Sequence, residues 1–271
     1  MTTAVHRGGV FGTGAFLFSI ACYGVFLVVF LYLLAFLANL QATPLGDAAP
    51  VLRELVPLSV DLGRDRGSLP GALAVDIGLL LLFGLQHSVM ARPAFKRAWT
   101  YVVPKELERS TYVLLSSVVL AVLLWQWRPI PAPVLWHAST TWAAVLGWSI
   151  MGLGVAVLLW ATFLIDHFEL FGLKQGWFSL RGRELPGPAF VTPYLYKLVR
   201  HPLYAGWLLI FWGAPTMSAG HLVFSAVMSG YILVALRFEE RDLVRHIGEP
   251  YRRYRQQVPA LLPRPGRRFS G

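Results

Sequence analysis

The sequence contains little charge and almost no cysteine. Asp, Glu, Lys and Arg make up only 14% of its 271 residues, whereas soluble globular domains carry about 25% charged residues. The one cysteine, Cys22, lies within an apolar run, which excludes a disulfide framework and a structural zinc site built on cysteines, and we expect no metal site. Hydrophobic residues make up 56% of the chain, which indicates that much of its surface faces lipid rather than water.

Hydrophobic runs long enough to cross a bilayer recur along the whole chain. A membrane-spanning helix needs about 20 mostly apolar residues. Six segments come close to that length: residues 16–40, 71–90, 111–127, 141–165, 202–220 and 221–238. The third is short, and the last two are so close in sequence that we expect a tight helical hairpin. The small residues Gly152 and Ala156 are expected to pack against a neighbouring helix. The sequence therefore predicts an all-α fold, a polytopic transmembrane helical bundle with five to six spans.

Basic residues are unevenly distributed between the two sides that these spans define. The net charge of +10 fits either nucleic-acid binding or the excess of Lys and Arg in the cytosolic loops of membrane proteins. With the N-terminus inside, 20 of the 24 Lys and Arg residues fall on the inner side. This distribution favours the second explanation, so we expect both termini in the cytosol and no nucleic-acid partner. The basic tail, residues 259–271, is expected to contact anionic membrane lipid.

A histidine, a proline and a tyrosine mark the start of the fifth predicted span. Pro202 suits the first turn of a helix, where its missing N–H costs nothing, and it holds His201 in an extended conformation. Tyr204 lies about one turn further on, at a similar membrane depth. The predicted hairpin returns to the same side of the membrane at Glu239 and Glu240. We therefore expect the imidazole and the two carboxylates to meet at the inner face, where ionisable groups are candidates for a functional site.

Each of these features also has a purely structural explanation. A His-Pro pair commonly starts a helix, and a Glu-Glu pair at a helix end often forms a solvated face. The run from Tyr251 to Tyr254 could anchor the chain at the membrane interface. It is their order along the chain, with one hairpin between them, that favours a common binding site.

The same stretch resembles a family of membrane methyltransferases, the isoprenylcysteine carboxyl methyltransferases and phospholipid N-methyltransferases. The shared pattern is Arg-His-Pro-x-Tyr, then a hairpin, then Glu-Glu-x-x-Leu and Gly-x-x-Tyr-x-x-Tyr, present here as residues 200–204, 239–243 and 248–254. The resemblance implies that residues 194–259 bind S-adenosyl-L-methionine in a cytosolic-face cofactor pocket of a single membrane-embedded methyltransferase domain, residues 1–271. The cofactor contacts that it implies are His201, Tyr204, Glu239, Glu240 and Tyr251, together with Lys197 and Arg200.

The rest of the chain resembles one bacterial branch of this family, the methanethiol S-methyltransferases, also called NnrU-like. The similar segments are residues 84–93, 104–112 and 166–175. This resemblance implies methyl transfer from S-adenosyl-L-methionine to a small thiol, methanethiol, giving dimethyl sulfide, in a bacterial inner (cytoplasmic) membrane. Two alternatives stay open: the acceptor is a prenylcysteine carboxylate or a lipid amine, or the chain is a non-enzymatic membrane transport or assembly protein. The sequence also leaves the oligomeric state open.

The implied reaction needs a base, because the thiolate is the competent nucleophile and a small thiol is mostly protonated at neutral pH. His87 ends the second predicted span and His167 ends the fourth, both at the depth of the cofactor motif, and histidine is the usual base near neutral pH. Arg109 precedes the third span, where it could hold a thiolate or pair with Glu108 or Glu169. Both histidines also have a packing explanation, and the sequence does not decide which one is the base. The candidate catalytic residues are His87, His167, Asp166 and Arg109.

Overall fold

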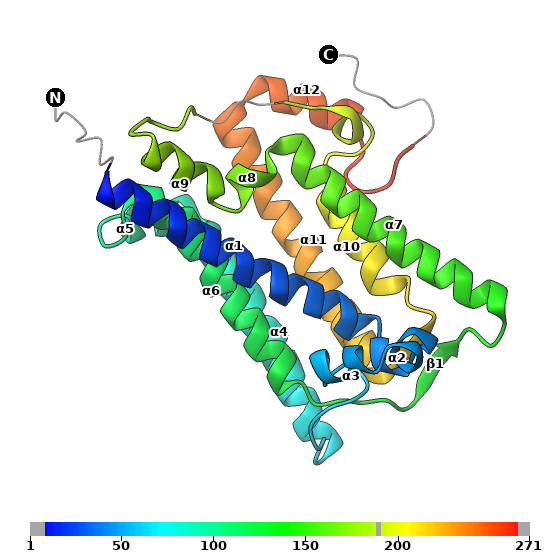
Figure 1. Cartoon of the computed structure of the whole chain (residues 1–271). Helices are drawn as coiled ribbons and strands as arrows, with labels where there is room; N and C mark the ends of the chain where they lie inside the picture. Colours follow the sequence, from blue (N-terminus) through cyan, green and yellow to red (C-terminus); the bar gives the residue numbers. More distant parts are fainter. Residues whose placement is uncertain (1–8, 188–190, 265–271) are drawn as a thin grey trace. The chain divides into compact units, whose positions relative to one another are not determined.

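The structure is a computed structural model that describes residues 9–187 and 191–264, and within them the chain is built almost entirely of helices (Figure 1). The long helices are α1 (Val10–Leu37), α4 (Leu69–Ala91), α6 (Lys105–Gln126), α7 (Thr141–Ile165) and α11 (Ala219–Ile247). The shorter ones are η1 (Leu40–Ala42), α2 (Pro44–Ala48), α3 (Val51–Leu55), α5 (Pro93–Trp99), α8 (His167–Leu170), α9 (Leu173–Leu180), η2 (Tyr194–Lys197), α10 (Pro202–Trp212) and α12 (Glu249–Gln257). Two short strands, β1 (Val134–His137) and β2 (Thr216–Ser218), form an antiparallel pair.

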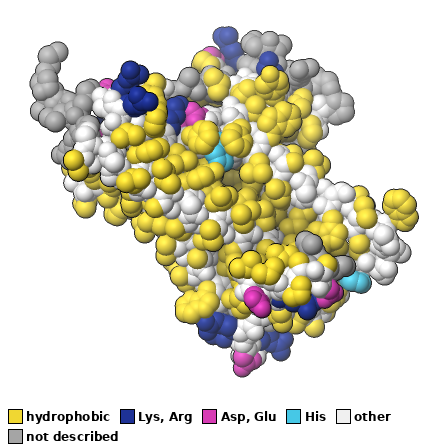
Figure 2. Space-filling model, in the orientation of Figure 1, with side chains coloured by type: hydrophobic (Ala, Val, Ile, Leu, Met, Phe, Trp, Pro, Cys, Tyr) yellow, Lys and Arg dark blue, Asp and Glu magenta, His cyan; other side chains and the backbone are white. Residues whose placement is uncertain are grey.

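Five of the helices in the described residues are long and apolar enough to cross a membrane, and they are the five long ones. The mean hydropathy of their most apolar windows lies between 1.6 and 2.6, and protein buries less than half of each window. On α1, for example, Val28 is 67% exposed and Leu31 is 55% exposed, and Figure 2 shows hydrophobic side chains along much of this helix. Lipid must cover an apolar surface of this extent. The chain is therefore a multi-pass membrane protein, and the predicted all-α fold is confirmed.

The described residues fall into two compact units, and each unit is described by itself. Unit 1 contains residues 9–59, 78–127 and 166–187, and unit 2 contains residues 60–77, 128–165 and 191–264. The first third of α4 belongs to unit 2 and the rest of this helix to unit 1. That both units form one membrane-embedded methyltransferase domain stays a prediction.

In unit 1, helix α1 packs against α6 and α9. Small residues allow α1 and α9 to approach closely. A Cβ atom on Gly12 would lie 2.5 Å from the carbonyl oxygen of Ser179, and one on Gly176 would lie 2.5 Å from Oγ of Ser19. These contacts fix α9 on α1, and α8 directly precedes α9 in the chain.

In unit 2, helix α7 packs against α10 through two glycines. A Cβ atom on Gly154 would lie 2.7 Å from the carbonyl oxygen of Gly206. Conversely, a Cβ atom on Gly206 would lie 2.8 Å from the carbonyl oxygen of Gly154. The predicted packing pair, Gly152 and Ala156, is wrong, because both residues are exposed and a Cβ on Gly152 would meet nothing within 4 Å. The small-residue contact exists, but it lies on another face of α7.

The fifth predicted span, residues 202–220, is not one continuous helix. α10 ends at Trp212, and Pro215 follows shortly, where a proline cannot continue a helix. Its 11 residues rise roughly 16 Å, which is about half of a bilayer core. The third predicted span, in contrast, is not short: α6 begins at Lys105 and contains 22 residues.

α10 and α11 form the predicted hairpin, although only α11 is long enough to span a bilayer. Nε2 of His201, which precedes α10, lies 3.1 Å from Oε1 of Glu240 near the end of α11, so these two ends lie on the same side of the membrane. From Ala219 to Glu240, α11 rises about 32 Å. In the opposite direction, α10 rises roughly 16 Å, and the carbonyl oxygen of Phe211 near its end accepts a hydrogen bond from Ser225 of α11 at 2.8 Å. The even number of crossings expected from the charge distribution stays a prediction, because α10 is shorter than the five helices of the described residues that could span a bilayer.

Candidate functional site

The start of α10 places His201 beside the end of α11. His201 is the N-cap of α10, with Pro202 as the first helical residue, and His201 is only 5% exposed. Its Nε2 lies 3.1 Å from Oε1 of Glu240 and must be the donor, because a carboxylate can only accept. Arg200 donates to the same oxygen from Nε at 2.7 Å and pairs with it through Nη2 at 2.5 Å. Glu240 is thus held by two neighbouring donors at the base of the hairpin.

Glu239 precedes Glu240 but has a different environment. Its side chain is 45% exposed, compared with 13% for Glu240. Oε2 of Glu239 accepts a hydrogen bond from the hydroxyl of Tyr204 at 2.6 Å, and the Tyr204 ring stacks on His201 with 5.6 Å between ring centroids. Glu239 is therefore the more accessible of the two acids, and its predicted contact with a cofactor stays a prediction.

Arg200 also fixes the chain that follows α12. Its Nη1 donates to the carbonyl oxygen of Val258, and its backbone N–H donates to that of Pro259 at 2.9 Å. The backbone N–H of His201 donates to the carbonyl oxygen of Ala260 at 3.0 Å. The contacts of Arg200 therefore hold the end of α12 beside the start of α10, and direct cofactor contact by Arg200 stays a prediction.

Two tyrosines of α12 complete the motif. Tyr251 and Tyr254 form a small buried cluster with Val258. Burial raises the pKa of both phenols above the ordinary value of tyrosine, so both stay protonated and can donate hydrogen bonds. Tyr254 donates to the carbonyl oxygen of Tyr196 at 2.5 Å. Lys197, at the end of η2, is half-buried.

His167, the second candidate base, begins α8 in unit 1. It is 5% exposed, and its Nε2 lies 2.9 Å from the hydroxyl oxygen of Tyr23 on α1. Its ring packs against Phe171 with 4.8 Å between ring centroids. Burial lowers the pKa of His167 below its ordinary value of 6.5, and the negative charge of Asp166 offsets only part of this effect. The imidazole is therefore neutral near pH 7 and able to accept a proton.

Asp166 caps α8 and binds a lysine of α9. Its Oδ1 accepts the backbone N–H of Glu169 at 3.0 Å, and its Oδ2 accepts a hydrogen bond from the ammonium of Lys174. Burial opposes ionisation, but these two hydrogen bonds outweigh it and hold the pKa of Asp166 below its ordinary value. The carboxylate is thus charged and structurally engaged, and its predicted catalytic role stays a prediction.

His87, on α4, forms a second histidine–tyrosine pair in unit 1. The hydroxyl oxygen of Tyr112 lies 2.9 Å from Nε2 and 3.1 Å from Nδ1 of His87. Oγ of Ser116 lies 3.3 Å from Nδ1, and Phe83 stacks on the imidazole with 5.5 Å between ring centroids. Both ring nitrogens of His87 therefore face hydroxyl groups of the protein.

Arg109 connects α6 with α8 through a backbone carbonyl. Its Nε donates to the carbonyl oxygen of Leu170 at 2.6 Å. Its two expected acidic partners bind lysines instead: Glu108 lies 3.8 Å from Lys96, and Glu169 lies 3.1 Å from the lysine of α9 that also binds Asp166. The guanidinium thus positions α8, the helix that begins with a candidate base.

The four predicted catalytic residues all lie in unit 1, where a series of side-chain and backbone contacts connects them. The cofactor motif belongs to unit 2. Arg109 lies 5.0 Å from the ring centroid of Tyr112, which binds His87, and it also binds the end of α8. Sequence reasoning assigned no role to Tyr112 or Tyr23. The available signal was a phenol inside a predicted apolar span, since a buried tyrosine hydroxyl usually has a hydrogen-bond partner.

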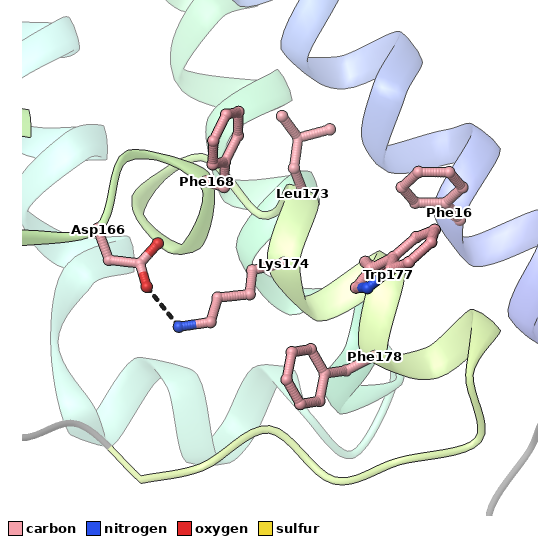
Figure 3. Close-up of a pocket in the computed structure, with 7 residues that line it drawn as sticks. All are labelled: Phe16, Asp166, Phe168, Leu173, Lys174, Trp177 and Phe178. Atoms are coloured by element: carbon pink, nitrogen blue, oxygen red, sulfur yellow. Dashed lines mark hydrogen bonds and ion pairs between the residues drawn. The ribbon is translucent and has the colours of Figure 1, made fainter. Parts of the chain in front are cut away.

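A cavity of about 540 Å³ lies beside α8 and α9 in unit 1 (Figure 3). Its lining consists of Phe16, Asp166, Phe168, Leu173, Lys174, Trp177 and Phe178. Figure 3 shows the Asp166–Lys174 ion pair on one side of the cavity and the rings of Phe16 and Trp177 on the other. Phe168 also packs edge-on against His167, with 5.5 Å between ring centroids. The cavity is therefore mostly apolar, and His167, a candidate base, does not line it but contacts Phe168 of the lining.

Neither a protein-family model nor a solved structure matches the chain, but several known proteins do. Methanethiol S-methyltransferase 2 of Bradyrhizobium diazoefficiens is 48% identical over 92% of this chain and 89% of its own length. The methanethiol S-methyltransferase of Mycobacterium tuberculosis is 45% identical over 93% of this chain and 96% of its own length. Nurim of Danio rerio is more distant, at 32% identity over 73% of this chain and 74% of its own length.

Proposed function

The chain belongs to the methanethiol S-methyltransferase family, and from this premise we propose that it transfers a methyl group to methanethiol, giving dimethyl sulfide. The observation that carries this proposal is the extent of the similarity. Relatives of this name are 43–49% identical to the chain, and the match to one of them covers 92% of this chain. These relatives are named as enzymes, so the non-enzymatic alternative does not hold.

We infer that the methyl donor is S-adenosyl-L-methionine and that the hairpin motif of unit 2 binds it. The residues present fit this cofactor. The exposed carboxylate of Glu239 can accept hydrogen bonds from a ribose or an amino group, and it can balance a sulfonium charge. Lys197 can bind a carboxylate, and the buried Tyr251 is a neutral donor. When bound, the cofactor would supply an electrophilic methyl group.

His201 and Glu240 position the more exposed residues of this proposed site. Both are largely buried, at 5% and 13% side-chain exposure, and their mutual contact joins the two ends of the hairpin. Because this contact holds the start of α10 beside the end of α11, it also keeps Tyr204 beside Glu239. The exposed carboxylate of Glu239 is thereby pre-organised for a ligand. Pre-organised groups lose less conformational freedom when they bind.

The acceptor side of the reaction is proposed for unit 1. A neutral imidazole, His167 or His87, would accept the proton of the thiol, because the thiolate is the nucleophile. Apolar walls around the base exclude water and favour a reaction in which opposite charges are neutralised. Methanethiol is small and apolar, so it can reach such a site through the membrane.

We also propose that the protein lies in a bacterial inner membrane with both termini in the cytosol. The charge distribution supports this orientation, because 20 of the 24 Lys and Arg residues fall on the inner side. The expected lipid contact of the tail, residues 259–271, lies mainly outside the described residues, which end at 264.

Two measurements test the proposed function. Membranes that contain the protein, S-adenosyl-L-methionine and methanethiol should release dimethyl sulfide into the headspace, detected by gas chromatography. Parallel assays with a prenylcysteine and with phosphatidylethanolamine test the alternative acceptors, and turnover of either one in place of methanethiol would overturn the substrate assignment. Isothermal titration of the purified protein with S-adenosyl-L-methionine tests the cofactor separately.

A further inference from the structure

The hydroxyl of Tyr23 contacts Nε2, one of the two ring nitrogens of the candidate base His167. The hydroxyl oxygen lies 2.9 Å from Nε2, and the two rings meet edge to face with 5.7 Å between centroids. Phe171 packs against both rings, at 5.9 Å from Tyr23 and 4.8 Å from His167. This packing holds the hydroxyl and Nε2 in a fixed relation.

The two partners differ in how accessible they are. His167 is 5% exposed, whereas Tyr23 is only half-buried. The Tyr23 hydroxyl lies within hydrogen-bond distance of Nε2, at 2.9 Å, so it occupies the place that a thiol would need in order to bind that nitrogen. Direct proton transfer from the thiol to Nε2 would require the Tyr23 hydroxyl to leave its place.

We propose that Tyr23 is a catalytic residue that relays the proton of the thiol to His167, an inference that rests on the proposed function. The S–H bond of the thiol breaks and its proton binds the oxygen of Tyr23, while the original O–H bond of Tyr23 breaks and that proton binds Nε2 of His167. The sulfur keeps its electron pair, which would form the new bond to the methyl carbon, while the bond between that carbon and the sulfonium sulfur of the donor would break and leave its electron pair on the donor sulfur. The resulting imidazolium lies next to the carboxylate of Asp166, which stabilises the positive charge.

The other histidine–tyrosine pair fits a relay less well. Tyr112 is only 6% exposed and belongs to a buried cluster with Met90 and Val113. Its hydroxyl lies within hydrogen-bond distance of both ring nitrogens of His87, which gives a packed pair with no accessible phenol. The cavity beside α8 adjoins His167 through Phe168.

The test uses the purified full-length protein and the substitution Tyr23→Phe, which removes only the hydroxyl. Its kcat for methanethiol at pH 7 should fall by at least about tenfold, a threshold set below the roughly 10²–10⁴-fold that general acid–base catalysis typically contributes. The double variant Tyr23→Phe/His167→Ala should be no slower than His167→Ala, because residues that act as one unit are not additive. The loss in Tyr23→Phe should shrink as the pH approaches the pKa of methanethiol, where the thiol ionises without help. This pKa lies above the value of about 8.5 for a free cysteine, because methanethiol lacks the electron-withdrawing backbone groups of cysteine.

A matched control and two further readouts separate a relay from packing. Tyr32 lies on the same helix and exchanges hydrogen bonds only with Leu58 among the contacts described for its hydroxyl, so Tyr32→Phe should keep full turnover. S-adenosyl-L-methionine affinity and melting temperature of Tyr23→Phe should match the wild type. In the absence of cofactor, the ¹⁵N resonance of His167 Nε2 should shift when the Tyr23 hydroxyl is removed.

The outcomes distinguish the inference from the proposed function. A wild-type protein that does not methylate methanethiol refutes the proposed function. If the wild type is active, three results would each overturn only the relay. The first is a kcat of Tyr23→Phe within twofold of the wild-type value, and the second is additive losses of kcat in the double variant. The third is a loss in Tyr23→Phe that does not shrink at high pH.

Discussion

Arg200 donates its Nε–H to Oε1 of Glu240 at 2.7 Å, so the second acid of the Glu-Glu pair is bound to protein. The first acid, Glu239, is 45% exposed and accepts a hydrogen bond from Tyr204. Two acids that the sequence presents as equivalent therefore have different surroundings. Glu240 joins the ends of the hairpin to each other and, through Arg200, to the end of α12, whereas the carboxylate of Glu239 is the more exposed of the two.

Substitution of the two acids should have different effects. Glu239→Ala should abolish binding of S-adenosyl-L-methionine in isothermal titration, while its melting temperature stays near that of the wild type. Glu240→Ala leaves the charge of Arg200 without its carboxylate, and breaking such a largely buried pair costs about 3 kcal/mol or more. Its melting temperature in detergent should therefore fall clearly. Equal effects of both substitutions on melting would contradict the division of roles.

His201→Ala should also abolish binding of S-adenosyl-L-methionine. The substitution removes both the ring that stacks on Tyr204 and the donor to Glu240. The same titration measures the loss, with Trp142→Ala as a control, because Trp142 is 84% exposed on α7. Normal affinity of His201→Ala would remove His201 from the cofactor site.

At least one of the variants His87→Ala and His167→Ala should lower turnover by at least about tenfold. Cofactor affinity should stay near normal in both, since neither histidine belongs to the hairpin motif. The contacts of unit 1 favour His167 as the residue with the larger effect. Full activity in both variants would show that the base lies elsewhere or that the thiolate arrives preformed.

The pH dependence of turnover should reflect a base with a lowered pKa. Burial holds the pKa of His167 below 6.5, and only the neutral imidazole accepts a proton. The kcat should therefore be constant from pH 6.5 to about 8 and should decrease as the pH falls below 6.5 through the lowered pKa. A decrease with its midpoint above pH 6.5 is not compatible with this environment of His167.

The contact between α7 and α10 allows a stability test with a matched control. Gly154→Ala places a methyl group 2.7 Å from a backbone oxygen of Gly206, and overpacking of this kind costs typically 1–3 kcal/mol. Gly152→Ala adds the same group where no atom lies within 4 Å, so it should be neutral or slightly stabilising in a helix. Melting temperatures in detergent that rank the two variants in the reverse order would disprove the contact.

Much of the fold follows from the sequence, because hydrophobic length alone identifies membrane helices. The bounds near proline differ most from the prediction, because α10 ends at Trp212, shortly before Pro215, and not at residue 220. The hairpin contact between His201 and Glu240 was predicted correctly, since a return to the same membrane side brings the two motifs together. The sequence could not rank Glu239 and Glu240, because their difference comes from Arg200 and from chain that follows α12.

The site in unit 1 was only partly predictable. His87 and His167 stand out as ionisable residues at predicted helix ends, but their partners Tyr112 and Tyr23 come from other helices. The spacing of residues along one helix does not show which residue of a neighbouring helix lies within hydrogen-bond distance. The packing of α7 shows the same limit, because Gly152 and Gly154 are equally small and only the neighbouring helix distinguishes them.

The most direct test of the central claim is the mass of the product formed from methanethiol and methyl-deuterated S-adenosyl-L-methionine. Membranes containing the wild-type protein should release dimethyl sulfide that carries one deuterated methyl group, and membranes with Glu239→Ala should release none. Unlabelled dimethyl sulfide, or no product from the wild type while cofactor binding is intact, would contradict methyl transfer from this cofactor to methanethiol.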